Sequence, residues 1–158
     1  MPQELEPAAA VSPDVSALDA AVAEVLETMF FTEATGESCC HESWKPAAGA
    51  RVGFEGTHCG AVYLGVSTDA ARSMAAGFLG LDDAELTGTQ LNQVMLEFTN
   101  IVCGAAMSRL WPESSLSLAP PEPLDTRGVP EGGWHRCFAL PDGMLAVTIC
   151  LRGDGLRE

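Results

Sequence analysis

The longest periodic segment of the chain is TQLNQVMLEFTNIVCGAAMSRL, residues 89–110. Apolar residues recur in it at alternating steps of four and three, which is the repeat of one helix face. Pro112 cannot continue a helix, because it lacks a backbone N–H and its ring clashes with the preceding turn. The pattern predicts one long helix that buries a single apolar stripe, formed by Leu91, Met95, Phe98, Val102 and Ala105.

Polar residues of this helix gather on the face that points away from the stripe. At about 100° per residue, four of them lie within roughly 60° of one another; they are Gln93, Glu97, Asn100 and Gly104. Asn is a poor helix former, and Gly costs about 1 kcal/mol relative to Ala in a helix interior. A solvated helix face commonly carries polar residues. The two unfavourable choices nevertheless favour a functional surface, on which Gly104 would let another molecule approach the helix backbone.

Weaker patterns on both sides predict the remaining elements. A helical repeat that Asp14 or Ser16 could cap predicts a first helix ending near Phe31. Period-two alternation predicts strands, and Gly80 can end a later helix in a left-handed conformation. These further elements are a strand near Trp44, a hairpin of residues 51–55 and 61–66, a helix from about Ser67 to Phe78, a strand over 115–119, and a hairpin of residues 134–140 and 144–151 joined by Pro141, Asp142 and Gly143.

The order of the predicted elements indicates the fold class. It lacks the regular alternation of strands and helices that builds a doubly wound parallel sheet. We therefore expect an α+β domain in which a largely antiparallel sheet packs against long helices. This domain is expected to span residues 14–152, between a flexible N-terminal tail, residues 1–13, and a C-terminal tail, residues 153–158.

The composition argues against several classes of partner. Of 158 residues, 22 are acidic and 8 are Lys or Arg, and the resulting formal charge of −14 repels nucleic-acid phosphates and anionic lipid surfaces. No uncharged apolar run reaches the length of about 18 residues that a transmembrane helix needs. The N-terminal residues lack the basic region and apolar core of a secretory signal. We expect a cytoplasmic protein that neither binds nucleic acid nor inserts into a membrane.

Six cysteines are too few for a disulfide-stapled scaffold of this length. In the cytoplasm they are most simply reduced thiols, and Cys103, Cys137 and Cys150 lie among apolar residues as core side chains do. A second group has metal-ligand types but lacks the two-residue gap of zinc-binding cysteine pairs. A redox or metal protein built on this group stays an alternative; its members are Cys39, Cys40, His41, His58 and Cys59.

The segment EFTNIVCG, residues 97–104, resembles the active-site helix of the CheC, CheX and FliY phosphatase family. That family's signature is Glu-x-x-Asn followed by Gly one turn later, which here corresponds to Glu97, Asn100 and Gly104. Residues 21–30, AVAEVLETMF, also resemble the family's first helix. The order of the remaining elements fits as well, so the resemblance extends over about residues 17–151.

The first helix distinguishes the types within this family. CheC-type members carry a second Glu-x-x-Asn there, whereas this chain has Glu24 and Glu27 without an accompanying Asn. The resemblance therefore implies one site per chain, as in the CheX type. CheX-like relatives also imply a homodimer.

The resemblance implies a phosphatase that hydrolyses the aspartyl phosphate of a CheY-like receiver protein. In that reaction Asn100 would orient the attacking water and Glu97 would pair with a receiver Lys, while Gln93, Gly104 and Met107 would contact the partner. The receiver would carry Mg²⁺, and this chain would need no cofactor or metal of its own. The alternative is a CheX-like module that docks on a receiver or a signalling complex without catalysis.

Overall fold

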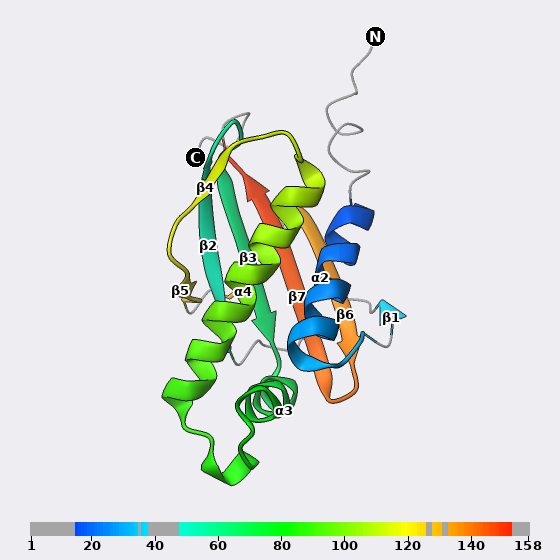
Figure 1. Ribbon diagram of the computed structural model, residues 1–158, viewed down its shortest axis with the longest axis vertical. Coiled ribbons are helices and arrows are strands. Elements are labelled where there is room, and N and C mark those ends of the chain that lie inside the picture. The colour runs from blue at the N-terminus through cyan, green and yellow to red at the C-terminus, as the bar shows by residue number, and fades with distance from the viewer. Residues whose placement is uncertain (1–14, 35, 38–47, 126–127, 131–132, 153–158) are drawn as a thin grey trace.

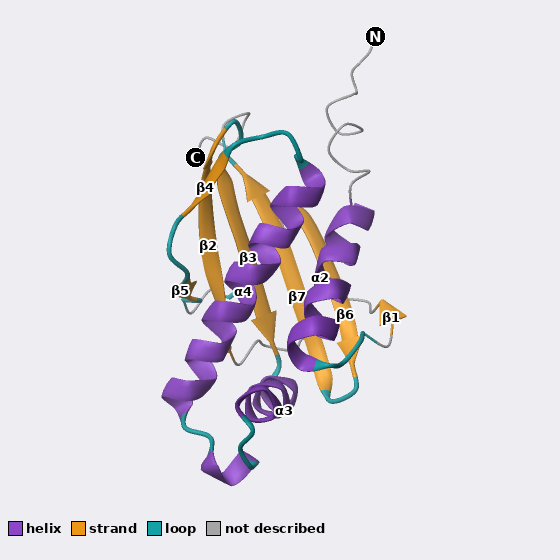
Figure 2. Cartoon of the chain, in the orientation of Figure 1, coloured by secondary structure: helices purple, strands orange, loops and turns teal. Residues whose placement is uncertain are grey.

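The computed structural model describes residues 15–34, 36–37, 48–125, 128–130 and 133–152. The predicted tails and the predicted strand near Trp44 lie outside these residues. In the described part, one antiparallel sheet carries helices α2 and α4 side by side across one face, and α3 lies at one end of them (Figures 1 and 2). The chain therefore has the α+β fold that the sequence predicts.

Most element boundaries agree with the sequence pattern. The helices are α2 (Val15–Phe30), α3 (Thr68–Leu79), the short 3-10 helix η2 (Asp83–Glu85) and α4 (Gly88–Leu110). The strands are β1 (Gly36–Glu37), β2 (Ala48–Gly56), β3 (Gly60–Val66), β4 (Leu116–Leu118), β5 (Glu122–Pro123), β6 (Trp134–Leu140) and β7 (Gly143–Leu151). The sequence pattern missed β1, β5 and η2, which are too short to show a period.

The described sheet has the strand order β1-β6-β7-β3-β2-β4, and β5 pairs with β2. All of these pairings are antiparallel; for example, Val62 of β3 lies opposite Val52 of β2 and Ile149 of β7. From the sequence we expect the terminal strands to expose sheet edges. In the described sheet the first strand, β1, is an edge strand that pairs only with Phe138 and Ala139 of β6, whereas the last strand, β7, lies between β6 and β3. A homodimer stays a prediction.

The core lies between the helices and the inward face of the sheet. Alternate residues of β2, β3 and β7 point into it, as the period of a strand requires. Buried side chains of α2 and α4 pack against these strand residues. In α4 the buried stripe includes Met95, Phe98 and Val102, as predicted. No helix in the described ranges is long and apolar enough to cross a membrane.

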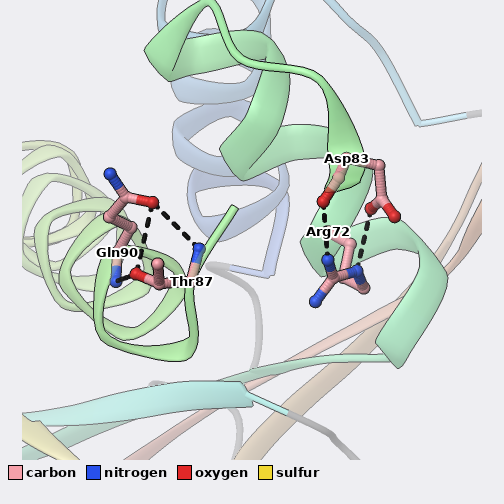
Figure 3. Close-up of polar contacts among 4 residues, drawn as sticks. All are labelled: Arg72, Asp83, Thr87 and Gln90. Carbon is pink, nitrogen blue, oxygen red and sulfur yellow. Dashed lines mark hydrogen bonds and ion pairs between the residues drawn. The ribbon is translucent and has the colours of Figure 1, made fainter. Parts of the chain in front are cut away.

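The start of α4 is fixed by a capping box (Figure 3). The Gln90 backbone N–H donates to the Thr87 hydroxyl at 3.1 Å, and the Thr87 backbone N–H donates to Gln90 Oε1 at 2.9 Å. Both contacts satisfy N–H groups that a helix end leaves without partners. In the preceding turn, Arg72 of α3 binds Asp83 of η2 through its Nε at 2.8 Å. The entry into α4 is thus tied both to its own first turn and to α3.

Phe98 anchors the middle of α4. Its side chain is fully buried, and its ring packs edge-on against Phe30 of α2 with centroids 4.9 Å apart. Phe98→Ala should lower the free energy of unfolding by about 3–5 kcal/mol, since it removes the buried ring and leaves a cavity. Urea denaturation would measure this loss.

The matched control is Gln93→Ala on the exposed face of the same helix, which should change stability by no more than about 0.5 kcal/mol. Equal losses in the two variants would show that the α2–α4 contact does not hold the fold together.

Candidate functional site

The candidate site is the solvent-facing strip of α4. Gln93 and Glu97 are exposed, while Asn100 and Gly104 are half-buried. A methyl group added at Gly104 would meet no atom within 4 Å, apart from the helix's own nearby backbone. The helix wheel therefore placed these four residues correctly on one accessible face, and Gly104 leaves a bare patch of helix backbone next to Asn100.

Glu97 and Asn100 are not engaged by the rest of the described chain. Neither side chain makes a hydrogen bond or an ion pair with any described residue. In contrast, Glu24 of α2 forms an ion pair with Arg109 of α4, and Asp19 accepts two hydrogen bonds of 2.9 Å from Arg136. One carboxylate and one carboxamide, one helical turn apart, thus remain available for a partner.

The α4 backbone that carries Glu97 and Asn100 is anchored on the buried side of the helix. Thr99, between Phe98 and Asn100, is fully buried, and its hydroxyl donates to the Met95 carbonyl at 2.8 Å. This bond satisfies a polar group that would otherwise be costly in the core. The pair Glu97 and Asn100 therefore lies on a helix whose rotation is fixed by packed neighbours.

Two residues of the face differ from the sequence prediction. Met107, which was predicted to contact the partner, is only 5% exposed and belongs to the core, so the structure gives no support to that role. Ile101 was missed, although it is 38% exposed and lies one turn after Glu97 on the same strip. The helix wheel gives the direction of Ile101, outside the apolar stripe, but the exposure of this side chain depends on how far neighbouring elements cover the helix.

The cysteines behave in two ways. Cys59 and Cys103 are free thiols, whereas Cys137 is disulfide-bonded, so the expectation of reduced thiols is wrong for Cys137. Burial raises the pKa of the Cys103 thiol to about 12, which keeps it protonated and unreactive at neutral pH. Although Cys103 is in the same helix as the candidate pair, it faces the core.

The proposed metal cluster is only partly described. Cys39, Cys40 and His41 lie outside the described residues. His58 stacks on Trp111 with ring centroids 4.0 Å apart, and in the described ranges no group of three His, Cys, Asp or Glu side chains is arranged to hold a metal ion. The described part therefore adds no support to the metal alternative.

Comparisons with solved structures show the same fold in chemotaxis proteins. The chain superimposes with a TM-score of 0.69 on the chemotaxis protein CheX from Vibrio vulnificus, at 20% identity over 87% of this chain and 98% of that one. A CheC-like superfamily protein from Shewanella sp. PV-4 gives a TM-score of 0.70 at 17% identity, covering 88% and 97% of the two chains.

A third structure is the CheX–CheY–BeF₃–Mg²⁺ complex from Borrelia burgdorferi. It matches with a TM-score of 0.69 at 22% identity, over 87% of this chain and 97% of that one. No curated protein shows significant sequence similarity to this chain.

The family assignment comes from the sequence of the central region. Residues 48–131 match the family model described as chemotaxis phosphatase CheX. The matched region contains the whole of α4, with the Glu97 and Asn100 pair and the accessible patch at Gly104. The chain belongs to the CheX family of chemotaxis phosphatases.

Proposed function

We propose that this chain hydrolyses the aspartyl phosphate of a CheY-like receiver protein in bacterial chemotaxis or two-component signalling. The observation that carries the proposal is the pairing of Glu97 and Asn100 on the exposed strip of α4, where neither side chain is engaged by a described residue. Membership of the CheX family supports this reaction. The Borrelia burgdorferi structure, in which a CheX is complexed with CheY, supports the choice of a receiver as partner.

In this proposal Asn100 orients the attacking water. A carboxamide offers both a donor and an acceptor, so it can hold one water molecule in line with the phosphorus atom. It is also uncharged, and therefore does not repel the phosphoryl oxygens. The water oxygen bonds to phosphorus while the bond from phosphorus to the receiver's aspartyl oxygen breaks, leaving an aspartate carboxylate and inorganic phosphate. Positioning of this kind lowers the barrier without a general base.

Glu97 fixes the docking register. Its exposed carboxylate would form a charge-assisted hydrogen bond with the receiver's Lys, one helical turn from Asn100. The receiver would bring its own Mg²⁺, which neutralises charge on the phosphoryl oxygens. This chain would then contribute no cofactor. Gln93, Gly104 and Ile101 border the same strip and would complete the contact.

A docking module without catalysis is the second candidate function. It would use the same strip, because exposed carboxylate and carboxamide groups serve binding as well as hydrolysis. The two functions differ in whether the purified chain accelerates loss of phosphate from a phosphorylated receiver. A homodimer and a cytoplasmic location stay predictions from the sequence.

Replacement of Asn100 tests the catalytic role. Asn100→Ala should lower turnover by about 100-fold or more, because the water is no longer held in line, while receiver affinity stays nearly unchanged. Asn100→Asp should be about as inactive, since it puts a negative charge against the phosphoryl group and loses the amide donor. Release of phosphate from a phosphorylated receiver would be measured together with urea denaturation.

Neither Asn100 variant should cost more than about 0.5 kcal/mol of stability. Full activity of Asn100→Asp, or unfolding of both variants, would exclude Asn100 as the water-orienting residue.

Replacement of Glu97 tests the docking role. Glu97→Ala should raise the Kd for the receiver about tenfold and reduce the salt dependence of binding, because one charge pair is lost. The matched control is Glu55→Gln, which changes an exposed carboxylate whose position in β2 alternates with the core residue Phe54. Isothermal titration would compare the three proteins at low and high salt. Equal affinity of all three would rule out Glu97 as a docking residue.

The proposed function and the cysteine alternative differ in whether activity depends on the cysteine side chains. Serine replacements of Cys39, Cys40 and Cys59 should leave phosphatase activity near that of the unmodified chain, because the proposed reaction uses no thiolate. Phosphate release by the triple variant would be the measurement, with circular dichroism as the control for folding. Loss of activity in a folded variant would instead favour the redox or metal reading.

A further inference from the structure

The residue that follows α2 has an unfavourable backbone conformation. Phe31 has φ of 53°, and no other described residue except glycine has a positive φ. This left-handed region is rare for bulky side chains, because the Cβ atom approaches the carbonyl oxygen. The backbone N–H groups of Phe31 and Thr32 donate to the carbonyls of Glu27 and Leu26, each at 3.2 Å, so the chain turns back over the last helical turn.

A second helix of the same chain shows the usual solution to this turn. Helix α3 ends at Gly80, which has φ of 70° and adopts the left-handed conformation without steric cost. The two helix ends therefore differ in the residue at the equivalent position. Burial does not offset the unfavourable backbone conformation of Phe31, because 89% of this residue is exposed to solvent.

A surface cavity lies beside Phe31. Its volume is about 230 Å³, and its wall is formed by the end of α2, by α3 and by the turn between β6 and β7. The lining residues include the apolar Met74 and Leu140 and the exposed, acidic Asp142. A cavity of about 150 Å³ can already hold a benzene ring, so this one has room for a single large side chain of another protein.

Aromatic contacts connect this region to the candidate site. Phe30, the neighbour of Phe31, packs against Phe98 of α4 and lies 5.8 Å from the ring of Phe78, which is 46% exposed. Phe98 is the neighbour of Glu97. Helices α2 and α4 lie side by side on the sheet (Figure 1). Phe30 and Phe98 thus pack in series between the end of α2 and the middle of α4, the helix that carries Glu97 and Asn100.

We propose that Phe31 and the adjoining cavity form a second docking contact for the receiver, with Phe31 as the anchor. This inference rests on the proposed function, because the receiver is the partner assigned to the neighbouring strip. The receiver surface would present a large apolar side chain for the cavity and a basic group for Asp142. None of the described residues that line the cavity is a Lys or Arg, and the chain carries a formal charge of −14, so a basic partner surface is favoured.

The Phe31→Gly variant tests the docking role of Phe31 separately from its effect on stability. Glycine relieves the left-handed strain, so the urea midpoint should stay the same or rise. Loss of an exposed aromatic anchor should raise KM for the phosphorylated receiver about tenfold with kcat unchanged, since Phe31 does not touch the reacting atoms. Phe31→Asn, another residue tolerated in this conformation, serves as the second variant. Leu118→Ala, which truncates an apolar residue 36% exposed on β4, is the matched control.

The experiment measures phosphate release, titration with a receiver carrying BeF₃ and Mg²⁺, and light scattering. A raised KM and Kd in both Phe31 variants, with the control unchanged, would support the second contact. Unchanged values in both variants would overturn it while the proposed function stands. If the unmodified chain neither binds nor dephosphorylates receivers, the proposed function fails and this contact fails with it. A change of oligomeric state in the Phe31 variants would assign the surface to a second copy of the chain and overturn the receiver contact.

Discussion

The packing of α4 is the constraint on which the other features depend. This helix contacts β2, α2 and α3, so its buried arc is wider than the stripe of a helix that lies on one neighbour. Only one strip remains open to solvent, and that strip carries Glu97 and Asn100. The same packing that supplies the core therefore determines where a partner can reach the helix.

Two exposed ion pairs around α4 affect the orientation of the neighbouring helices more than the stability of the fold. Glu24 and Arg109 join α2 to α4, and Arg72 and Asp83 join α3 to η2, but all four side chains are at least one third exposed. Pairs of this kind typically contribute between about 0 and 1 kcal/mol. Their positions nevertheless connect each neighbouring element to α4 or to its entry, which limits how far these helices can rotate around their axes.

The sequence predicted long elements well because they bury long periodic faces. The boundaries of α4, the left-handed end of α3 at Gly80, and the β6–β7 hairpin all follow from periodicity and turn chemistry. Short elements such as η2 and β5 depend on tertiary contacts and leave no period. Met107 and Ile101 were misjudged for a related reason. A helix wheel gives the direction of a residue, but not how far the neighbouring elements cover the helix on each side.

The capping box at Thr87 and Gln90 has a consequence for how this protein can vary. Because the box sets the first turn and the core sets the rest, α4 has a fixed phase from its cap to Asn100. One inserted or deleted residue between them would turn the following positions by about 100° and separate the side chains that now share the candidate face. The number of residues between Thr87 and Asn100 is therefore constrained by the position of the candidate face as well as by the core.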